Sequence, residues 1–121
     1  MTVATPVVLV VEDEILVREM TVDFVDLAGC TTVTASNADE AVAILESRQD
    51  IALVVTDINM AGSMDGLKLA HAVRDRWPPI NIIVVSGKMR PTINELPIRA
   101  FFLAKPFKGD DLISAVRRFV A

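Results

Sequence analysis

The chain has 121 residues, of which 52% are hydrophobic and 5% aromatic, and its net charge is −4. This length fits one domain over residues 1–121, and the apolar content is too high for a disordered chain. No apolar run approaches the roughly 20 residues of a membrane span, and a single cysteine excludes a disulfide framework. The acidic balance argues against direct nucleic-acid binding. We therefore expect a soluble, cytoplasmic domain.

Strand-like and helix-like segments alternate through the first half of the chain. The valine and leucine run Val7–Val11 predicts a strand buried on both faces, and apolar spacing predicts a helix over Ile15–Ala28. The stripe of that helix is predicted to be Met20, Phe24 and Leu27. Thr31–Ala35 is less apolar and predicts an edge strand. Asn37, with Glu40 three residues later, has the capping-box spacing that begins a helix.

The second half continues this alternation. Ile51–Thr56 predicts a third strand, and apolar spacing from Leu67 to Trp77 predicts a helix that Pro78-Pro79 ends. Ile80–Val85 and Ala100–Leu103 predict two further strands. A last helix carries the apolar residues Leu112, Ile113, Val116, Phe119 and Val120. Strands that alternate with helices predict an α/β fold with a parallel sheet covered on both faces.

Polar side chains follow the most apolar strands. They are Glu12, Asp13, Asp57, Ser86 and Lys105. Because ligands bind beyond the carboxyl ends of parallel strands, these residues are expected to meet in one crevice. Three carboxylates in one crevice need either bound protons or a hard divalent cation. Mg²⁺ suits such oxygen ligands and keeps open positions at which a phosphoryl group can enter.

A carboxylate beside Mg²⁺, a lysine and a serine can accept a phosphoryl group. Asp57 ends a central strand, so we expect it to lie mid-crevice and to attack phosphorus, forming an acyl phosphate. Lys105 and the metal would neutralise charge on the phosphoryl oxygens, and Ser86 would add a hydroxyl donor. The strand ends therefore predict a phosphoryl acceptor.

With these residues in place, the sequence resembles the receiver domains of two-component response regulators, typified by the bacterial chemotaxis regulator. The matching segments are Val-Val-Glu12-Asp13-Glu, Val-Val-Thr-Asp57-Ile-Asn-Met, Met-Asp65-Gly66, Val-Val-Ser86-Gly87 and Phe102-Leu-Ala-Lys105-Pro106-Phe107. The resemblance covers essentially the whole chain. It implies a doubly wound, flavodoxin-like fold of five parallel strands in the order 2-1-3-4-5.

The resemblance also implies the chemistry of the site. Asp57 would accept a phosphoryl group from a histidine of a sensor kinase or of a histidine phosphotransfer protein. Mg²⁺ would be bound by Asp13, Asp57 and the backbone carbonyl of Asn59, with Glu12 acting through water. Such a protein is a signalling switch and not a turnover enzyme.

The resemblance further implies a switch. Lys105 and Ser86 would contact the phosphoryl oxygens, and movement of Ser86 would couple to an aromatic residue on the fifth strand, here Phe102. The Lys105-Pro106 bond is expected to be cis and to aim the lysine inward. A downstream protein partner would bind the face formed by the fourth helix, the fifth strand and the last helix.

Three features depart from the family pattern. The loop after the acceptor is one residue longer than usual, with Ala61 where proline is common. Phe102 replaces tyrosine, so switching would rest on burial alone. Pro91 and Pro97 leave only Thr92–Leu96 for the fourth helix, which is therefore expected to be short or irregular.

Other functions remain open at this point. The fold could serve as a phosphorylation-independent adaptor. An aspartyl-phosphate hydrolase is suggested by Asp57-Ile-Asn59, although Asn59 cannot act as the general acid. A flavodoxin-like cofactor binder is disfavoured because Glu12-Asp13-Glu14 would repel phosphate. The domain could work alone or belong to a larger regulator.

Five other features are interpreted as structural. Asp65 is expected to cap a helix, Trp77 to pack at a helix end, and Cys30 to pack as a small apolar group. His71 is expected at the surface, without metal ligands beside it. The cations of Arg117-Arg118 suit the negative end of the last helix dipole, and a binding role for them stays open.

Overall fold

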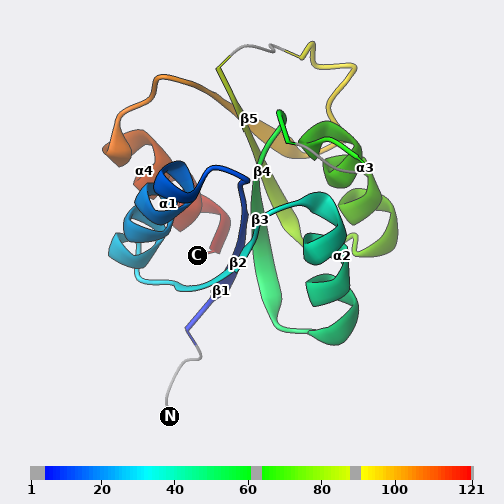
Figure 1. The fold of residues 1–121 in the computed structure, drawn as a ribbon, viewed down its shortest axis with the longest axis horizontal. Helices are drawn as coiled ribbons and strands as arrows, with labels where there is room; N and C mark the ends of the chain where they lie inside the picture. The colour runs from blue at the N-terminus through cyan, green and yellow to red at the C-terminus, as the bar shows by residue number, and fades with distance from the viewer. Residues whose placement is uncertain (1–4, 61–63, 88–90, 121) are drawn as a thin grey trace.

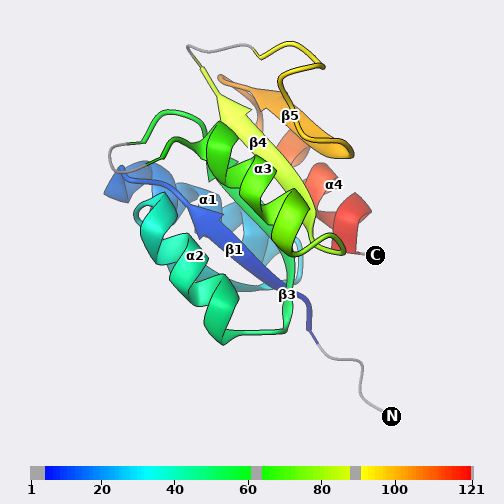
Figure 2. The ribbon, with the colours of Figure 1, turned by 90° about the vertical axis from the view of Figure 1, so that its right-hand side faces the viewer.

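A parallel sheet lies between two layers of helices in the computed structural model, which describes residues 5–60, 64–87 and 91–120. The strands are β1 (Val7–Val11), β2 (Thr31–Ala35), β3 (Ile51–Asp57), β4 (Asn81–Ser86) and β5 (Ala100–Ala104). The helices are α1 (Ile15–Leu27), α2 (Ala38–Ser47), α3 (Gly66–Arg76) and α4 (Gly109–Val120). Helices α1 and α4 cover one face of the sheet, and α2 and α3 cover the other (Figures 1 and 2).

The strand order is β2-β1-β3-β4-β5, and every neighbouring pair is parallel. This confirms the order expected from the resemblance. In the register, Asp57 pairs with Val85, and Ser86 pairs with Ala104. The carboxyl ends of the central strands therefore lie at one edge of the sheet, where the polar residues were predicted to meet.

The sheet buries its three central strands, as their continuous apolar runs predicted. One apolar core lies beneath α2 and α3, and a second lies beneath α1 and α4. The edge strand β2 is partly exposed, as predicted, and β5 is partly buried throughout.

The predicted stripe of α1 is right for Phe24, which packs against the core, and wrong for Met20 and Leu27. Met20 is 50% exposed and Leu27 is 64% exposed, whereas Val25 is fully buried. The inward face also includes Thr21, whose hydroxyl donates to the carbonyl of Val17 at 2.8 Å. This bond satisfies the hydroxyl group of Thr21 within its own helix. A polar residue can therefore lie on the inward face, which apolar spacing alone did not predict.

Side-chain caps begin two of the helices, as predicted. The Asn37 carboxamide oxygen accepts from the backbone N–H of Glu40 at 2.8 Å. The Glu40 carboxylate reaches back to the N–H of Ser36 instead of that of the cap residue. Asp65 accepts from the N–H of Lys68 at 2.9 Å and so begins α3.

The described part of the link between β4 and β5, residues 91–99, holds no helix. Within it the N–H of Glu95 donates to the carbonyl of Thr92 at 2.9 Å, and the N–H of Thr92 donates to the Glu95 carboxylate at 3.0 Å. These bonds close a single turn. The expected short, irregular fourth element is therefore confirmed.

The expectation for the loop after Asp57, with Ala61, falls outside the described residues.

The residues interpreted as structural behave accordingly. Cys30 is buried, and Trp77 packs partly buried at the end of α3. His71 is exposed. Arg117 donates to the carbonyl of Leu27 at 3.2 Å, which ties α4 to the end of α1. Among the described residues, no helix is long and apolar enough to cross a membrane.

Candidate functional site

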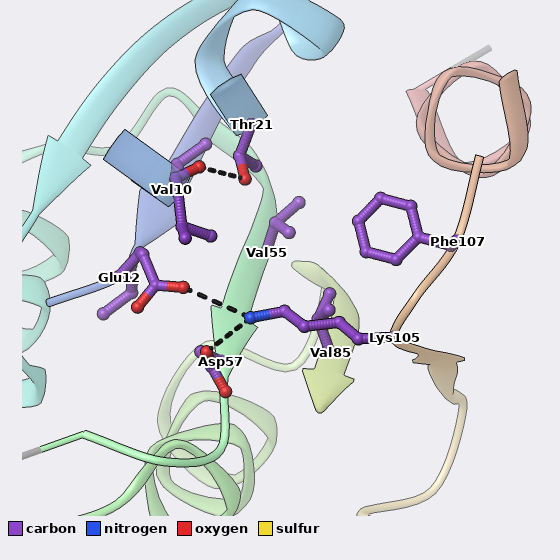
Figure 3. A pocket seen from close by; sticks show the side chains of 10 residues that line it. Val10, Glu12, Thr21, Val55, Asp57, Val85, Lys105 and Phe107 are labelled. Carbon is purple, nitrogen blue, oxygen red and sulfur yellow. Dashed lines mark hydrogen bonds and ion pairs between the residues drawn. The ribbon is translucent and has the colours of Figure 1, made fainter. Parts of the chain in front are cut away.

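Three charged side chains from three strand ends meet at the carboxyl edge of the sheet. Glu12 directly follows β1, Asp57 is the last residue of β3, and Lys105 directly follows β5. Figure 3 shows the lysine reaching across the edge so that its amine lies between the two carboxylates. The sequence therefore predicted the meeting of these three residues correctly.

The Lys105 amine is the centre of this cluster. Nζ lies 2.8 Å from Oδ2 of Asp57 and 3.5 Å from Oε1 of Glu12. The exposed fractions of the side chains are 30% for Lys105, 11% for Asp57 and 5% for Glu12. In such a poorly solvated place, charge-assisted hydrogen bonds are stronger than at an open surface.

Glu12 carries the clearest electrostatic perturbation. Burial raises the pKa of its carboxyl group from 4.5 to about 7, and hydrogen bonds to Asp57 and Asp13 together with the charge of Asp57 add to the rise. The N–H of Glu14 donates to Oε2 at 3.3 Å and partly opposes it. Glu12 therefore changes its charge near neutral pH.

Lys105 responds in the opposite sense to its surroundings. Burial lowers the pKa of its amine, but the hydrogen bond to Asp57 and the charges of Asp57 and Glu12 outweigh burial. The net pKa is raised, so the amine stays protonated near neutral pH. The cluster thus holds a permanent cation beside carboxylates that compete for it.

Hydrogen bonds to backbone carbonyls hold both loops that carry the carboxylates. The N–H of Glu12 donates to the carbonyl of Ala35 at 3.1 Å, and Arg18 donates to the carbonyl of Glu12 at 3.0 Å. The N–H of Ile58 donates to the carbonyl of Val85 at 3.1 Å. Arg18 was missed by the sequence reasoning, although a cation on the first turns of the helix after β1 was a visible signal.

Asp57 is held at both carboxylate oxygens. Oδ2 accepts from Lys105, and Oδ1 accepts from the N–H of Asn59 at 3.1 Å. Gly66, at the start of α3, donates its N–H to the carbonyl of Ile58 at 2.9 Å. A Cβ on Gly66 would overlap the carbonyl oxygen of Asp57 and lie 2.6 Å from its carbonyl carbon. A glycine is therefore required at position 66. The sequence showed the Asp65-Gly66 pair, but we had predicted no role for its glycine.

Ser86, Phe102 and Asp13 are the remaining predicted site residues. Ser86 ends β4 fully buried, and its carbonyl accepts from the N–H of Lys105 at 2.9 Å. Phe102 lies partly buried on β5 against the core beneath α2 and α3. Asp13 is exposed next to Glu12. The expected cis peptide bond between Lys105 and Pro106 is present.

The donor set fits Mg²⁺ better than a metal held wholly by protein. Within the described ranges, no three histidine, cysteine, aspartate or glutamate side chains are grouped so as to hold a metal ion. Mg²⁺ does not need such a cage, because it is usually bound by one or two carboxylates together with waters and phosphate oxygens. Asp13 and Asp57 supply carboxylates of this kind beside the buried, easily protonated Glu12.

Comparison with known proteins decides the family. A family model for the response regulator receiver domain matches residues 8–117. The chain belongs to this family. The resemblance predicted from the strand-end motifs is therefore confirmed, and receiver domains are signalling switches of two-component systems.

The receiver domain has relatives in both sequence and structure. It is 33% identical over 114 residues to response regulator protein FleR of Pseudomonas aeruginosa, which covers 92% of this chain but 24% of that protein. It is 31% identical to a solved response regulator receiver protein from Pseudomonas putida, with a TM-score of 0.80, covering 97% of this chain and 99% of that one. The chain thus spans about a quarter of the length of the curated relatives it matches.

One solved relative was crystallised with ligands. Response regulator protein TrrA of Thermotoga maritima, in complex with Mg²⁺-BeF, is 27% identical, with a TM-score of 0.83 over 95% of this receiver domain and 99% of that chain. A metal and a fluoride complex of beryllium are therefore bound by a protein with the same fold.

Proposed function

We propose that this receiver domain is a phosphoacceptor switch that takes a phosphoryl group on Asp57. The observation that carries the proposal is the cluster in which Lys105 and the N–H of Asn59 hold the two carboxylate oxygens of Asp57 at 2.8 and 3.1 Å. A carboxylate fixed at both oxygens beside a permanent cation is positioned for attack on phosphorus.

The transfer makes one bond and breaks one. A carboxylate oxygen of Asp57 attacks the phosphorus of a phosphohistidine, the new P–O bond forms, and the P–N bond breaks with its electron pair on the imidazole. Lys105 then turns from Asp57 toward a phosphoryl oxygen, and the hydroxyl of Ser86 donates to another. The result is an acyl phosphate on Asp57 and a free histidine on the donor.

Mg²⁺ would be held by Asp13, Asp57 and the carbonyl of Asn59, with Glu12 acting through water. When bound, it supplies positive charge to the phosphoryl oxygens. The residues of the chain orient that site: Arg18 fixes the carbonyl of Glu12.

The donor would be a sensor histidine kinase or a histidine phosphotransfer protein. A groove of about 530 Å³ opens beside Lys105, lined by apolar parts of α1 and of the loop after β5. Its apolar lining includes Val17, Met20, Phe24, Pro106 and Phe107. Ile15 and Leu16 extend an exposed apolar surface along α1. Such a surface next to the acceptor suits a protein donor.

The signal would leave by a second surface. After transfer, Ser86 and Phe102 would change position. A downstream protein would then bind the face formed by β5, α4 and residues 92–98, which lie between β4 and β5 and form no helix. Because Phe102 has no hydroxyl group, its contribution would be burial. The domain would act as a switch and not as a turnover enzyme.

The test is labelling by acetyl phosphate with Mg²⁺, followed by intact-mass measurement. The wild type should gain one phosphoryl group that hydroxylamine removes, and Asp57→Asn should gain none. Asp75→Asn, at an exposed aspartate of α3, is the matched control and should label normally. EDTA should abolish labelling.

Two other results would favour the alternatives. Rapid turnover of acetyl phosphate without an adduct would indicate a hydrolase. An unlabelled wild type that still binds its partner would indicate a phosphorylation-independent adaptor.

A further inference from the structure

Segment 92–98, which replaces the fourth helix, is fastened to α3 by two side chains. Nε2 of His71 lies 2.7 Å from the carbonyl oxygen of Glu95. Nε of Arg74 donates to the carbonyl of Ile98 at 2.8 Å. A carbonyl only accepts, so the imidazole donates from Nε2. His71 and Arg74 are three residues apart and hence lie on the same face of α3, beside which the segment passes in Figure 1.

Arg74 joins more than two elements. Its guanidinium group is buried and also donates from Nη1 to the carbonyl of Pro78 at 2.6 Å and to that of Ile80 at 3.0 Å. One guanidinium group thus ties α3 to the residues that precede β4 and to Ile98, in the turn that leads into β5. A lysine could not bridge these carbonyls in the same way.

The segment has an exposed side and a packed side, on which Pro97 is buried. Ile93 is 86% exposed and Ile98 is 72% exposed, whereas Leu96 packs partly against the core. Arg99 has a φ of 63°, a left-handed conformation that a side chain disfavours. Strained backbone of this kind persists where its surroundings fix it. The bonds from His71 and Arg74 hold the segment together with the packing of Leu96 and Pro97.

The other end of α3 touches the acceptor. Gly66 begins the helix, donates its N–H to the carbonyl of Ile58, and lies so close to the carbonyl of Asp57 that a Cβ would not fit. The helix has 11 residues, so it spans about 16 Å as one rigid element. It links Asp57 directly to segment 92–98.

We propose that His71 and Arg74 form a latch through which α3 couples the acceptor to segment 92–98. This coupling rests on the proposed phosphorylation of Asp57. A change at Asp57 shifts the first turn of α3, and the latch carries the shift to the exposed isoleucines of the segment. The described residues 91–99 hold no regular helix that could carry such a shift. In this chain, α3 carries it instead.

Amide exchange by NMR tests the latch in the unmodified protein. The N–H groups of Glu95 and Ala100 report on the segment, because they are bonded to the carbonyls of Thr92 and Pro97. His71→Ala removes one hydrogen bond, so both should exchange about fivefold faster. Asp75→Ala, another exposed position of α3, is the control and should change neither rate. Equal rates in wild type and His71→Ala would overturn the latch.

Arg74→Lys provides a second variant that keeps the charge and loses the fork. It should speed exchange of the same two amides more than His71→Ala does, because several bonds are lost. A melting curve checks that the variant is folded. If it is folded with wild-type exchange at Glu95 and Ala100, Arg74 is not part of a latch.

Beryllofluoride with Mg²⁺ tests the coupling. In the wild type, exchange in segment 92–98 should change at least twofold when the complex is added, and His71→Ala should lose most of that change. Labelling by acetyl phosphate is measured on the same samples. A labelled Asp57 with no response in the segment would overturn the coupling and leave the acceptor function standing. An unlabelled Asp57 would overturn both.

Discussion

Lys105 and Asp57 meet across an intervening strand: Nζ of the lysine, which follows β5, lies 2.8 Å from Oδ2 of the aspartate that ends β3. The lysine therefore supplies positive charge to the carboxylates of Asp57 and Glu12. The same contact places that charge next to the atom proposed to attack phosphorus.

Removal of this amine should slow the reaction without abolishing it. Lys105→Ala leaves the Asp57 carboxylate in place but takes a cation away from the phosphoryl oxygens, so labelling by acetyl phosphate should slow about a hundredfold. The final extent of labelling should be unchanged, while partner binding after labelling should be weak. The rate is measured by intact mass against time.

Lys108→Ala is the matched control, because Lys108 is exposed and lies three residues further along the chain. It should label at the wild-type rate. Complete failure of Lys105→Ala to label would show that the lysine is required for the acceptor itself, against the role assigned here.

The raised pKa of Glu12 predicts how stability depends on pH. Between about pH 4.5 and its folded pKa of about 7, folded Glu12 keeps a proton that the unfolded chain has released. Unfolding then releases a proton, so the free energy of unfolding falls as pH rises through this range and levels off above it. The contribution lost is at most about 3 kcal/mol. Urea titrations in EDTA, followed by the fluorescence of Trp77, measure it.

Glu12→Gln cannot titrate and should flatten this dependence. It should also make the metal-free protein more stable than wild type at about pH 8, where the wild-type carboxylate is charged. Mg²⁺ should flatten the wild-type curve as well, since it favours the ionised form. A wild-type curve that rises between about pH 5 and pH 8 in EDTA would contradict this account of Glu12.

The strand ends were predictable because the evidence for them is local and periodic. Continuous apolar runs identify buried parallel strands, and the carboxyl ends of such strands share one edge. The convergence of Glu12, Asp57 and Lys105 follows from these two rules. The same reasoning predicted that prolines would prevent a regular fourth helix.

Features that depend on tertiary contacts were not predictable in this way. The inward face of α1 includes Thr21, whose hydroxyl bonds within the helix, so apolar spacing wrongly placed Met20 and Leu27 on that face. The need for Gly66 comes from the carbonyl of Asp57, nine residues earlier in the chain. The bond from Arg74 to Ile98 joins residues 24 apart. For Gly66 and Arg74, no local pattern contains the partner.

Asp65 should matter for the start of α3 through its cap. Asp65→Ala removes the acceptor for the N–H of Lys68 and should lower the free energy of unfolding by about 1 kcal/mol. Asp65→Asn keeps a carboxamide oxygen at the same place and should be nearly neutral. Denaturant titrations compare the two. Calorimetric Mg²⁺ titrations should give the wild-type affinity for both variants, and a large loss in both would indicate that the carboxylate binds metal.

Alanine substitutions at Gly66 and Gly109 should distinguish a general packing defect from a defect at the acceptor Asp57. A Cβ at Gly66 would meet the backbone of Asp57, which cannot move without displacing the carboxylate, whereas a Cβ at Gly109 would meet the ring of Phe24. Both alanine variants should lose stability, by about 1–3 kcal/mol. Gly66→Ala should also slow labelling of Asp57 strongly, and Gly109→Ala should label normally when folded.

The stability lost in Gly109→Ala can be partly restored by a second substitution, whereas that lost in Gly66→Ala cannot. Phe24→Leu removes the ring that blocks a Cβ at Gly109, so the double variant should recover part of the stability lost in Gly109→Ala. Nothing comparable relieves Gly66→Ala, because the obstructing atoms belong to the peptide of Asp57. Labelling of Gly66→Ala at the wild-type rate, measured where the variant is fully folded, would show that the position of α3 does not control the acceptor.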